Sequence, residues 1–311
     1  MYKRLKKMCI LSVCLFMVTG CSINKKNNEG ISNKDQSLSS SKSGSVEKDG
    51  ASSEFKVTYT NISDKASRDL LVKLFDQAGI SRSRQDVFFN HLDQFNSSVD
   101  KKSLSNGLES AGVKDVKYDP YQMQDQWKKK NGDFEGYNCR ITSYGIFGDY
   151  IKVDGDKVID NTDDIAIDLL SLGDDNSAAK TDKELNSFKK IFSGVKTVET
   201  KDIKKHYQIL KKEWDARGIK FAKNDKASLV SVVFHSQIEK GDDKLFIGHV
   251  GIMLKSEDGI YFVEKVAFQE PYRFNKFKDK GQLKRYLMEK YDVEFDQPTS
   301  KPFVMENDSL I

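Results

Sequence analysis

Three runs rich in β-branched residues, separated by short turns, constrain the fold of this chain more than any other feature. The runs cover residues 227–236, 245–255 and 260–268. The two turns, 241–243 and 257–259, consist of Asp, Glu and Gly. Short strands joined by such turns are typical of an antiparallel meander. The sequence therefore predicts an antiparallel sheet in the C-terminal half.

The middle run carries a histidine, His249, between Gly248 and Gly251. Glycine weakens a strand and often marks a place where a ligand or another segment approaches the backbone closely. Side chains alternate along a strand, so the loop length decides which residue of the next strand faces His249. A two-residue loop brings Glu264 to that face, whereas a three-residue loop with a bulge brings Lys265. We favour Glu264, and the register stays open.

The residues before this sheet have the apolar periodicity of helices. His91 falls on a packed helical face and is predicted to lie in the core, whereas His206 is predicted to face solvent or the edge of an apolar stripe. The fold class is predicted to be α+β, with a helical N-terminal half packed on a C-terminal antiparallel β-meander. Helices are expected at 64–78, 83–99, 139–148, 163–172, 182–192, 202–217 and 280–291.

The N-terminus has the pattern of an export signal. Four basic residues precede a short apolar run at 9–17, and Gly20 is followed by Cys21. The apolar run is too short to span a bilayer. A small residue directly before a cysteine is similar to the lipobox of bacterial lipoproteins. The similarity implies a signal peptide at 1–20, lipid attachment at Cys21, and a protein anchored to the outer face of the cytoplasmic membrane.

Three further parts follow this predicted signal. Residues 21–54 contain the acylated cysteine and a Ser/Lys/Asn-rich tether, which cannot bury enough apolar surface to fold. Residues 55–296 form one globular domain, and residues 297–311 are expected to pack loosely. Export also changes the charge. The chain has 51 Lys+Arg and 47 Asp+Glu, and four of the basic residues lie in the signal, so the remaining chain is neutral. We therefore predict no nucleic-acid partner.

One cysteine, Cys139, lies outside the signal and the lipid-attachment site. Asn138 before it is a suitable helix N-cap. At a helix start, unpaired N–H groups favour the thiolate and lower the pKa of the thiol. Two interpretations stay open: an activated nucleophile, or a small buried apolar residue.

A metal site is a further reading of the histidines. His235, His249 and Glu264 could together ligate zinc, but they lack a recognised ligand spacing. We predict no metal and no other cofactor.

Papain-like cysteine hydrolases show a similar order of residues along the chain. The order is a cysteine at a helix start, then a histidine on the central strand, then a polar residue on the next strand. Gly248-His249-Val250-Gly251-Ile252 resembles the histidine strand of their NlpC-type cell-wall members. The whole domain resembles bacterial lipoproteins of the domain-of-unknown-function family 4300. The segments that carry this second likeness are Tyr137-Asn138-Cys139-Arg140, Gly248-His249-Val250-Gly251 and Phe262-Val263-Glu264-Lys265 to Glu270-Pro271-Tyr272.

The hydrolase resemblance implies a papain-like arrangement and a thiol mechanism. Cys139 would be the nucleophile, His249 the base and Glu264 the residue that orients the imidazole. Tyr137 and Asn138 are the candidate oxyanion or substrate residues. The implied substrates are amide bonds of peptidoglycan peptides. The alternative is a non-catalytic lipoprotein, a binding or wall-assembly module with a papain-like core. A solute-binding lipoprotein is disfavoured because strands and helices do not alternate along the chain.

Overall fold

A computed structural model describes residues 55–293 and 297–311 of the 311-residue chain. The predicted signal peptide, Cys21 and the tether lie outside these residues, as does the end of the predicted domain at 294–296. Within the described residues, no helix is both long and apolar enough to cross a membrane.

The predicted antiparallel meander forms the centre of a nine-stranded sheet with the order β11-β10-β6-β7-β8-β9-β1-β2, to which β4 adds by pairing with β7. All its paired strands are antiparallel. Together with the helices, this confirms the α+β class. The four central strands are β6 (Ala227–Gln237), β7 (Asp243–Ser256), β8 (Gly259–Ala267) and β9 (Glu270–Phe277).

The loop between β7 and β8 contains two residues, because Ser256 pairs with Gly259. In this register Met253 lies opposite Phe262. Side chains two residues apart share a face, so Glu264 lies on the same face as Met253 and His249. The favoured register is therefore the one that the structure adopts.

Both ends of the described chain add strands to this sheet, which corrects two predictions. The N-terminal half is not purely helical, since β1 (Lys56–Thr60) pairs with β9 and β2 (Glu109–Gly112) pairs with β1. Residues 297–311, expected to pack loosely, contain β10 (Phe303–Glu306), which pairs with β6, and β11 (Ser309–Leu310). Both segments are short, and the meander supplies the strands with which they pair.

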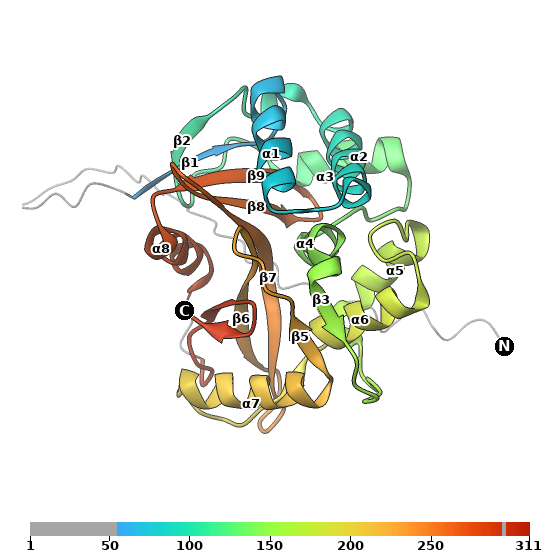
Figure 1. Cartoon of the computed structure of the whole chain (residues 1–311), viewed down its shortest axis with the longest axis vertical. Helices are drawn as coiled ribbons and strands as arrows, with labels where there is room; N and C mark the ends of the chain where they lie inside the picture. The colour runs from blue at the N-terminus through green and yellow to red at the C-terminus, as the bar shows by residue number, and fades with distance from the viewer. Residues whose placement is uncertain (1–54, 294–296) are drawn as a thin grey trace, which may run out of the picture. The chain divides into compact units, whose positions relative to one another are not determined.

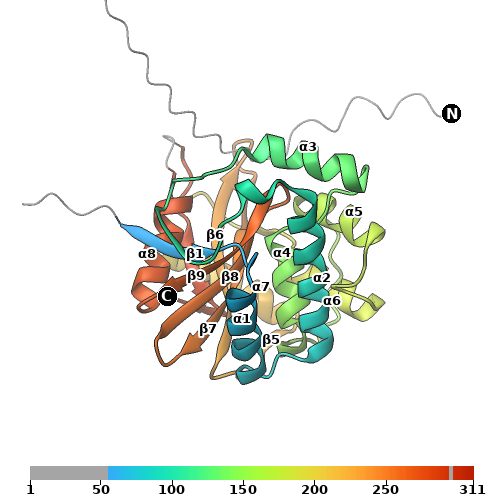
Figure 2. The ribbon, with the colours of Figure 1, turned by 90° about the horizontal axis from the view of Figure 1, so that it is seen from above.

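The sheet separates two hydrophobic clusters. Ile252 and Leu254 of β7 belong to the larger cluster, with α4 and the other N-terminal helices, whereas Met253 and Phe262 belong to the smaller one, under α8. Figure 2 shows α8 on one side of the sheet and α1, α2, α4 and α6 on the other. All the predicted helices are present, and α3, which was not predicted, has only two buried apolar side chains, Met123 and Trp127. The helices are α1 (Lys65–Gln77), α2 (Arg82–Ser98), α3 (Pro120–Asn131), α4 (Cys139–Phe147), α5 (Ala166–Asp174), α6 (Asp182–Phe192), α7 (Ile203–Ala216) and α8 (Lys280–Tyr291).

The connections between helices contain only short elements. A separate two-stranded sheet pairs β3 with β5, and β4 adds to the edge of β7. The bounds are β3 (Ile151–Val153), β4 (Val195–Lys196), β5 (Ile219–Phe221) and three 3-10 helices, Lys101–Ser103, Gly148–Tyr150 and Asp163–Ile165. Figure 1 shows this small sheet between α4 and α7.

Candidate active site

Cys139 is the first residue of α4, as the sequence predicts. Asn138 is the N-cap, and its Oδ1 accepts a hydrogen bond of 3.0 Å from the Ile141 N–H. The Asn138 carbonyl accepts the N–H of Thr142. The first-turn donors that remain are the N–H groups of Cys139 and Arg140, because the first N–H groups of a helix have no partner inside it.

The start of α4 fills a gap in the edge of β7. On this edge β4 pairs with β7 up to Leu245 and β8 pairs from Ile252 onward, so among the described residues 246–251 have no strand partner there. Two side chains of α4 bind the carbonyls of this stretch. Arg140 Nη1 donates to the Ile247 carbonyl at 3.1 Å, and Ser143 Oγ donates to the Val250 carbonyl at 3.2 Å.

This gap brings the three predicted catalytic residues together. Nε2 of His249 lies 2.5 Å from Oε2 of Glu264, and the thiol of Cys139 lies close enough to His249 for each side chain to shift the pKa of the other. Because Glu264 occupies Nε2, Nδ1 is the imidazole nitrogen available to Cys139. Cys139 is 5% exposed, His249 1% and Glu264 0%.

The charges of the three side chains depend on one another. Burial raises the pKa of the Cys139 thiol, but the polar interaction with His249 and the charges of His249 and Arg140 outweigh burial, so the pKa is lowered. Burial lowers the pKa of His249, but its contacts with Cys139 and Glu264 raise it to about 9. These directions favour a thiolate beside an imidazolium.

Glu264 is held by more than the imidazole. Its Oε1 accepts hydrogen bonds from Asn275 Nδ2, at 2.9 Å, and from the Tyr286 hydroxyl. Burial raises the pKa of Glu264, but the charge of Lys290 and the hydrogen bond with His249 outweigh it, so the pKa is lowered. The carboxylate form is therefore favoured inside the protein.

The two glycines beside His249 make room for aromatic rings. A Cβ at Gly248 would lie 2.2 Å from the Phe234 ring, and a Cβ at Gly251 would lie 2.4 Å from the Phe262 ring. The Tyr291 ring stacks on His249 with a centroid distance of 4.7 Å. The close approach that the glycines predict is thus made by core aromatic residues of the protein itself.

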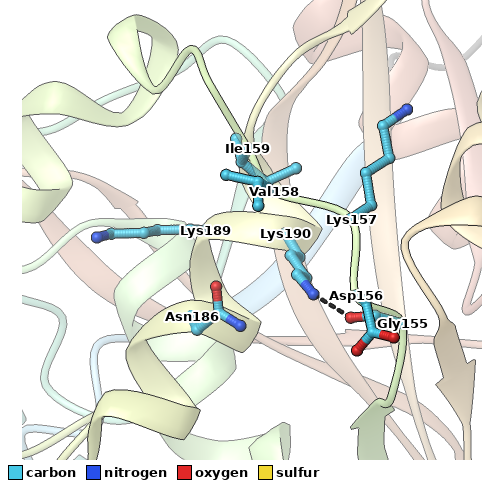
Figure 3. A pocket seen from close by; sticks show the side chains of 8 residues that line it. All are labelled: Gly155, Asp156, Lys157, Val158, Ile159, Asn186, Lys189 and Lys190. Atoms are coloured by element: carbon cyan, nitrogen blue, oxygen red, sulfur yellow. Dashed lines mark hydrogen bonds between the residues drawn. The ribbon is translucent and has the colours of Figure 1, made fainter.

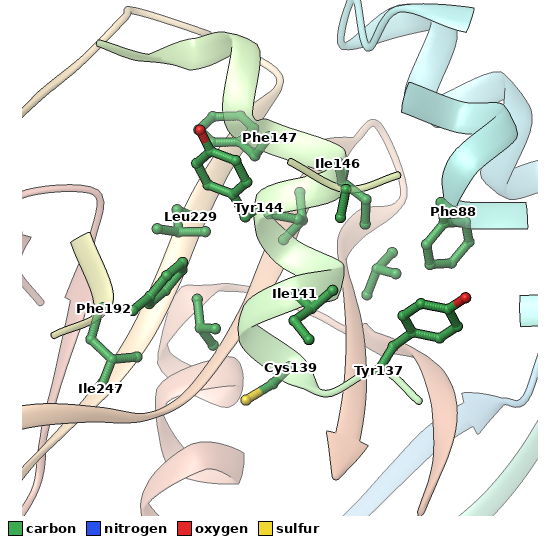
Figure 4. Close-up of a cluster of buried hydrophobic side chains, with 14 of the residues drawn as sticks. Phe88, Tyr137, Cys139, Ile141, Tyr144, Ile146, Phe147, Phe192, Leu229 and Ile247 are labelled. Carbon is green, nitrogen blue, oxygen red and sulfur yellow. The ribbon is translucent and has the colours of Figure 1, made fainter. Parts of the chain in front are cut away.

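The side chains of Tyr137 and Asn138, the predicted oxyanion or substrate residues, form hydrogen bonds with other side chains of the protein. The Tyr137 hydroxyl donates to Asp175 Oδ2 at 2.6 Å, and the same oxygen lies 2.9 Å from Gln94 Oε1. Figure 4 shows the Tyr137 ring and the Cys139 sulfur on opposite sides of the start of α4. Asn138 uses its side chain as the helix cap and as a donor to Asp168.

Asp168 is a site residue that sequence reasoning missed. Its Oδ1 accepts from Asn138 Nδ2 at 2.9 Å and from Arg140 Nε at 2.8 Å, and its Oδ2 accepts from Arg140 Nη2 at 2.7 Å. The carboxylate therefore binds the residues on both sides of Cys139 and joins α5 to α4. The sequence offers one signal, an acidic residue inside an otherwise apolar helix pattern.

The alternatives to Glu264 lie elsewhere. The ammonium of Lys265 donates to the carbonyls of Ala267, at 2.7 Å, and Phe268, at 3.1 Å. His235 lies 2.8 Å from Asp243 and accepts the Ser300 N–H. Within residues 55–293 and 297–311, no group of three or more His, Cys, Asp and Glu side chains is placed to hold a metal ion.

A separate surface hollow of about 430 Å³ lies between α6 and the loop after β3. Figure 3 shows that the Lys157 and Lys189 side chains point away from each other there. Lys190 donates to the Gly155 carbonyl, and Lys157 pairs with Glu213. No Cys, Ser, Thr or His side chain is among the described residues that line the hollow, so it does not repeat the thiol–imidazole arrangement of the site.

Comparisons with known proteins give one match. The family model described as Domain of unknown function (DUF4300) matches residues 58–311, which include every residue of the site. No curated protein and no solved structure matches the chain.

Proposed function

Because the chain belongs to the DUF4300 family, whose description assigns no activity, we propose from the site alone that it is a cysteine-dependent amide hydrolase. The observation that carries the proposal is the buried series Cys139–His249–Glu264 at the start of α4, in which His249 contacts Glu264 at 2.5 Å and interacts with the Cys139 thiol. A nucleophile, a base and a group that orients the base are the parts that thiol hydrolysis requires.

The proposed reaction has two halves. The Cys139 thiolate attacks the amide carbonyl carbon, the C–N bond breaks, and the His249 imidazolium gives its proton to the leaving amine. This leaves an acyl-thioester on Cys139. His249 then takes a proton from water, the resulting hydroxide attacks the thioester carbonyl, and the carboxylic acid leaves as the thiol is restored. Glu264 keeps the imidazole oriented and stabilises its charged form.

The oxyanion of each tetrahedral intermediate needs donors. The N–H groups of Cys139 and Arg140 point out of the first turn of α4, where the helix dipole also favours negative charge. The Tyr137 and Asn138 side chains have partners of their own. These two backbone groups are therefore the better candidates for the oxyanion site.

The proposed substrates are peptidoglycan peptides, and the proposed location is the outer face of the bacterial cytoplasmic membrane. Both rest on the lipobox-like N-terminus, with Cys21 as the lipid-attachment site and residues 21–54 as the tether. A papain-like arrangement is part of the same proposal. Its support is the order of Cys139 at a helix start, His249 on a central antiparallel strand and Glu264 on the next strand.

Burial of the site favours a second candidate, a non-catalytic wall-binding or assembly module. With 5% of Cys139 and 1% of His249 exposed, an amide bond reaches the sulfur only after the surrounding side chains move. The Tyr291 ring covers His249 and is the side chain that would have to move there. A thiol that reagents reach only after unfolding would support this second candidate.

The test is hydrolysis of purified muropeptides by the full-length protein and by Cys139→Ala and His249→Ala. We expect both variants to lose at least about 10³-fold in rate. His235→Gln is the matched control, since His235 is also buried but lies in a different hydrogen-bond network. Activity that persists in both variants, or an inactive parent with an unreactive thiol, would exclude the proposed enzyme.

A further inference from the structure

We propose that Lys290, in the last turn of α8, is a positioning residue for the series Cys139–His249–Glu264 and that it acts through Tyr286. This inference rests on the proposed function and deepens it. It assigns to α8 a role in the site that the sequence of this helix does not suggest by itself.

The geometry forms a directed series of hydrogen bonds. Lys290 and Tyr286 are one helical turn apart, and the Lys290 ammonium donates to the Tyr286 hydroxyl at 3.3 Å. The Tyr286 hydroxyl donates to Oε1 of Glu264, whose Oε2 contacts His249. Each donor polarises the next one, which strengthens a buried series of hydrogen bonds.

The position of Lys290 distinguishes it from an ordinary surface lysine. It is half-buried, whereas Tyr286 and Glu264 are fully buried. Among the described residues it forms no salt bridge with a carboxylate within 4 Å. Its charge is therefore directed at the site rather than neutralised by a neighbour on α8.

The charged groups that act on Lys290 come from three elements. They are Glu264 of β8, Arg273 and Glu270 of β9, and Cys139 of α4. Burial, with the positive charge of Arg273, lowers the pKa of Lys290, and the negative charges of Glu264, Glu270 and Cys139 oppose this shift without cancelling it. Interactions between charges are mutual, so the ammonium in turn favours the Glu264 carboxylate and the Cys139 thiolate.

The test measures the pH at which Cys139 becomes a thiolate, by ultraviolet difference absorbance of the full-length protein against its Cys139→Ser variant. We expect Lys290→Met to raise the midpoint by about one pH unit, which is a tenfold fall in the acid dissociation constant of the thiol. Tyr286→Phe should shift the midpoint in the same direction. Lys290→Arg should keep the midpoint close to that of the parent, since the positive charge is kept.

Lys284→Met is the matched control, because Lys284 is an exposed lysine of the same helix, and it should leave the midpoint unchanged. This inference would be overturned if the parent had a lowered thiolate midpoint and the same midpoint were found in Lys290→Met, Lys290→Gln and Tyr286→Phe. A parent thiol with an ordinary midpoint and no hydrolysis would instead overturn the proposed function. The two failures are therefore distinguishable.

Discussion

A thiol, an imidazole and a carboxylate that are almost completely buried can hold charge only by stabilising one another. Burial alone would keep Cys139 and Glu264 protonated and His249 neutral. The contacts among them, with Lys290 and Arg140 nearby, reverse each of these tendencies. A group of this kind costs stability unless every member is present.

Glu264→Gln tests this dependence at the scale of one residue. The variant keeps the size of the side chain but removes the charge that favours the imidazolium. We expect the pKa of His249 to fall and the thiolate midpoint of Cys139 to rise by roughly one to three units. NMR titration of the imidazole and thiolate absorbance measure the two shifts. Unchanged midpoints would mean that Glu264 packs beside the imidazole without stabilising its charge.

At the scale of the element, the start of α4 depends on one side chain with two tasks. Asn138 caps the helix through Oδ1 and binds Asp168 through Nδ2. Asn138→Ala removes both hydrogen bonds, and we expect a loss of about 2 kcal/mol in the free energy of unfolding. We also expect slower alkylation of Cys139, because the first turn loses its anchor. Urea unfolding and thiol kinetics measure the two effects.

Thr181→Ala is the control for this variant. Thr181 caps α6 in a capping box and lies in a separate helix. Thr181→Ala should lower the free energy of unfolding by a similar amount without changing the reactivity of Cys139. Equal effects of both variants on the thiol would show that only global stability matters.

At the scale of the whole molecule, the large sheet takes its outer strands from segments that are far apart in the sequence, and the C-terminal strand β10 is one of them. Met305 of β10 is fully buried and pairs with Ser231 of β6. We expect Met305→Ala to lower the free energy of unfolding by about 2–5 kcal/mol. Ser309→Ala, at an exposed position of β11, should change it by less than about 0.5 kcal/mol. Equal and small effects would indicate a loosely packed C-terminus.

The whole molecule should also lose stability in mild acid. His206, predicted to face solvent or the edge of an apolar stripe, is instead fully buried. Its Nδ1 lies 2.8 Å from the Thr197 hydroxyl, and its Nε2 lies 2.8 Å from the Thr200 carbonyl. Burial lowers its pKa below the ordinary value of 6.5. The unfolded chain therefore takes up the proton first, and stability falls as the pH drops through 6.5.

His206→Gln should flatten this dependence between pH 6.5 and 4.5, measured by chemical unfolding at a series of pH values. His249 acts in the opposite direction, because its pKa is raised to about 9. Its contribution is fully present below pH 6.5 and is lost as the pH rises through about 9. If the free energy of unfolding fell with the same slope below pH 6.5 in the parent and in His206→Gln, His206 would not be the source of the acid sensitivity.

Local patterns in the sequence were sufficient for most elements and for part of the site. Periodicity predicted seven of the eight described helices, and the Asp/Gly turn between β7 and β8 favoured the register that places Glu264 on the His249 face. The cap at Asn138 placed Cys139 at a helix start. Each of these depends on residues close together in the chain, which is the range over which propensity and alternation act.

Contacts between distant segments were decided only by the tertiary structure. Asp168 binds the residues beside Cys139 from a helix that begins 27 residues later, and Lys290 reaches Glu264 through Tyr286 from α8, on the side of the sheet opposite to α4. The gap in the edge of β7 that admits α4 exists because β4 and β8 stop short of each other. No local pattern encodes such a gap, because it depends on where three separate segments pack. The sequence by itself determined which residues could form a thiol site, and the packing of α4, α5 and α8 around one sheet decided that they meet and that they are buried.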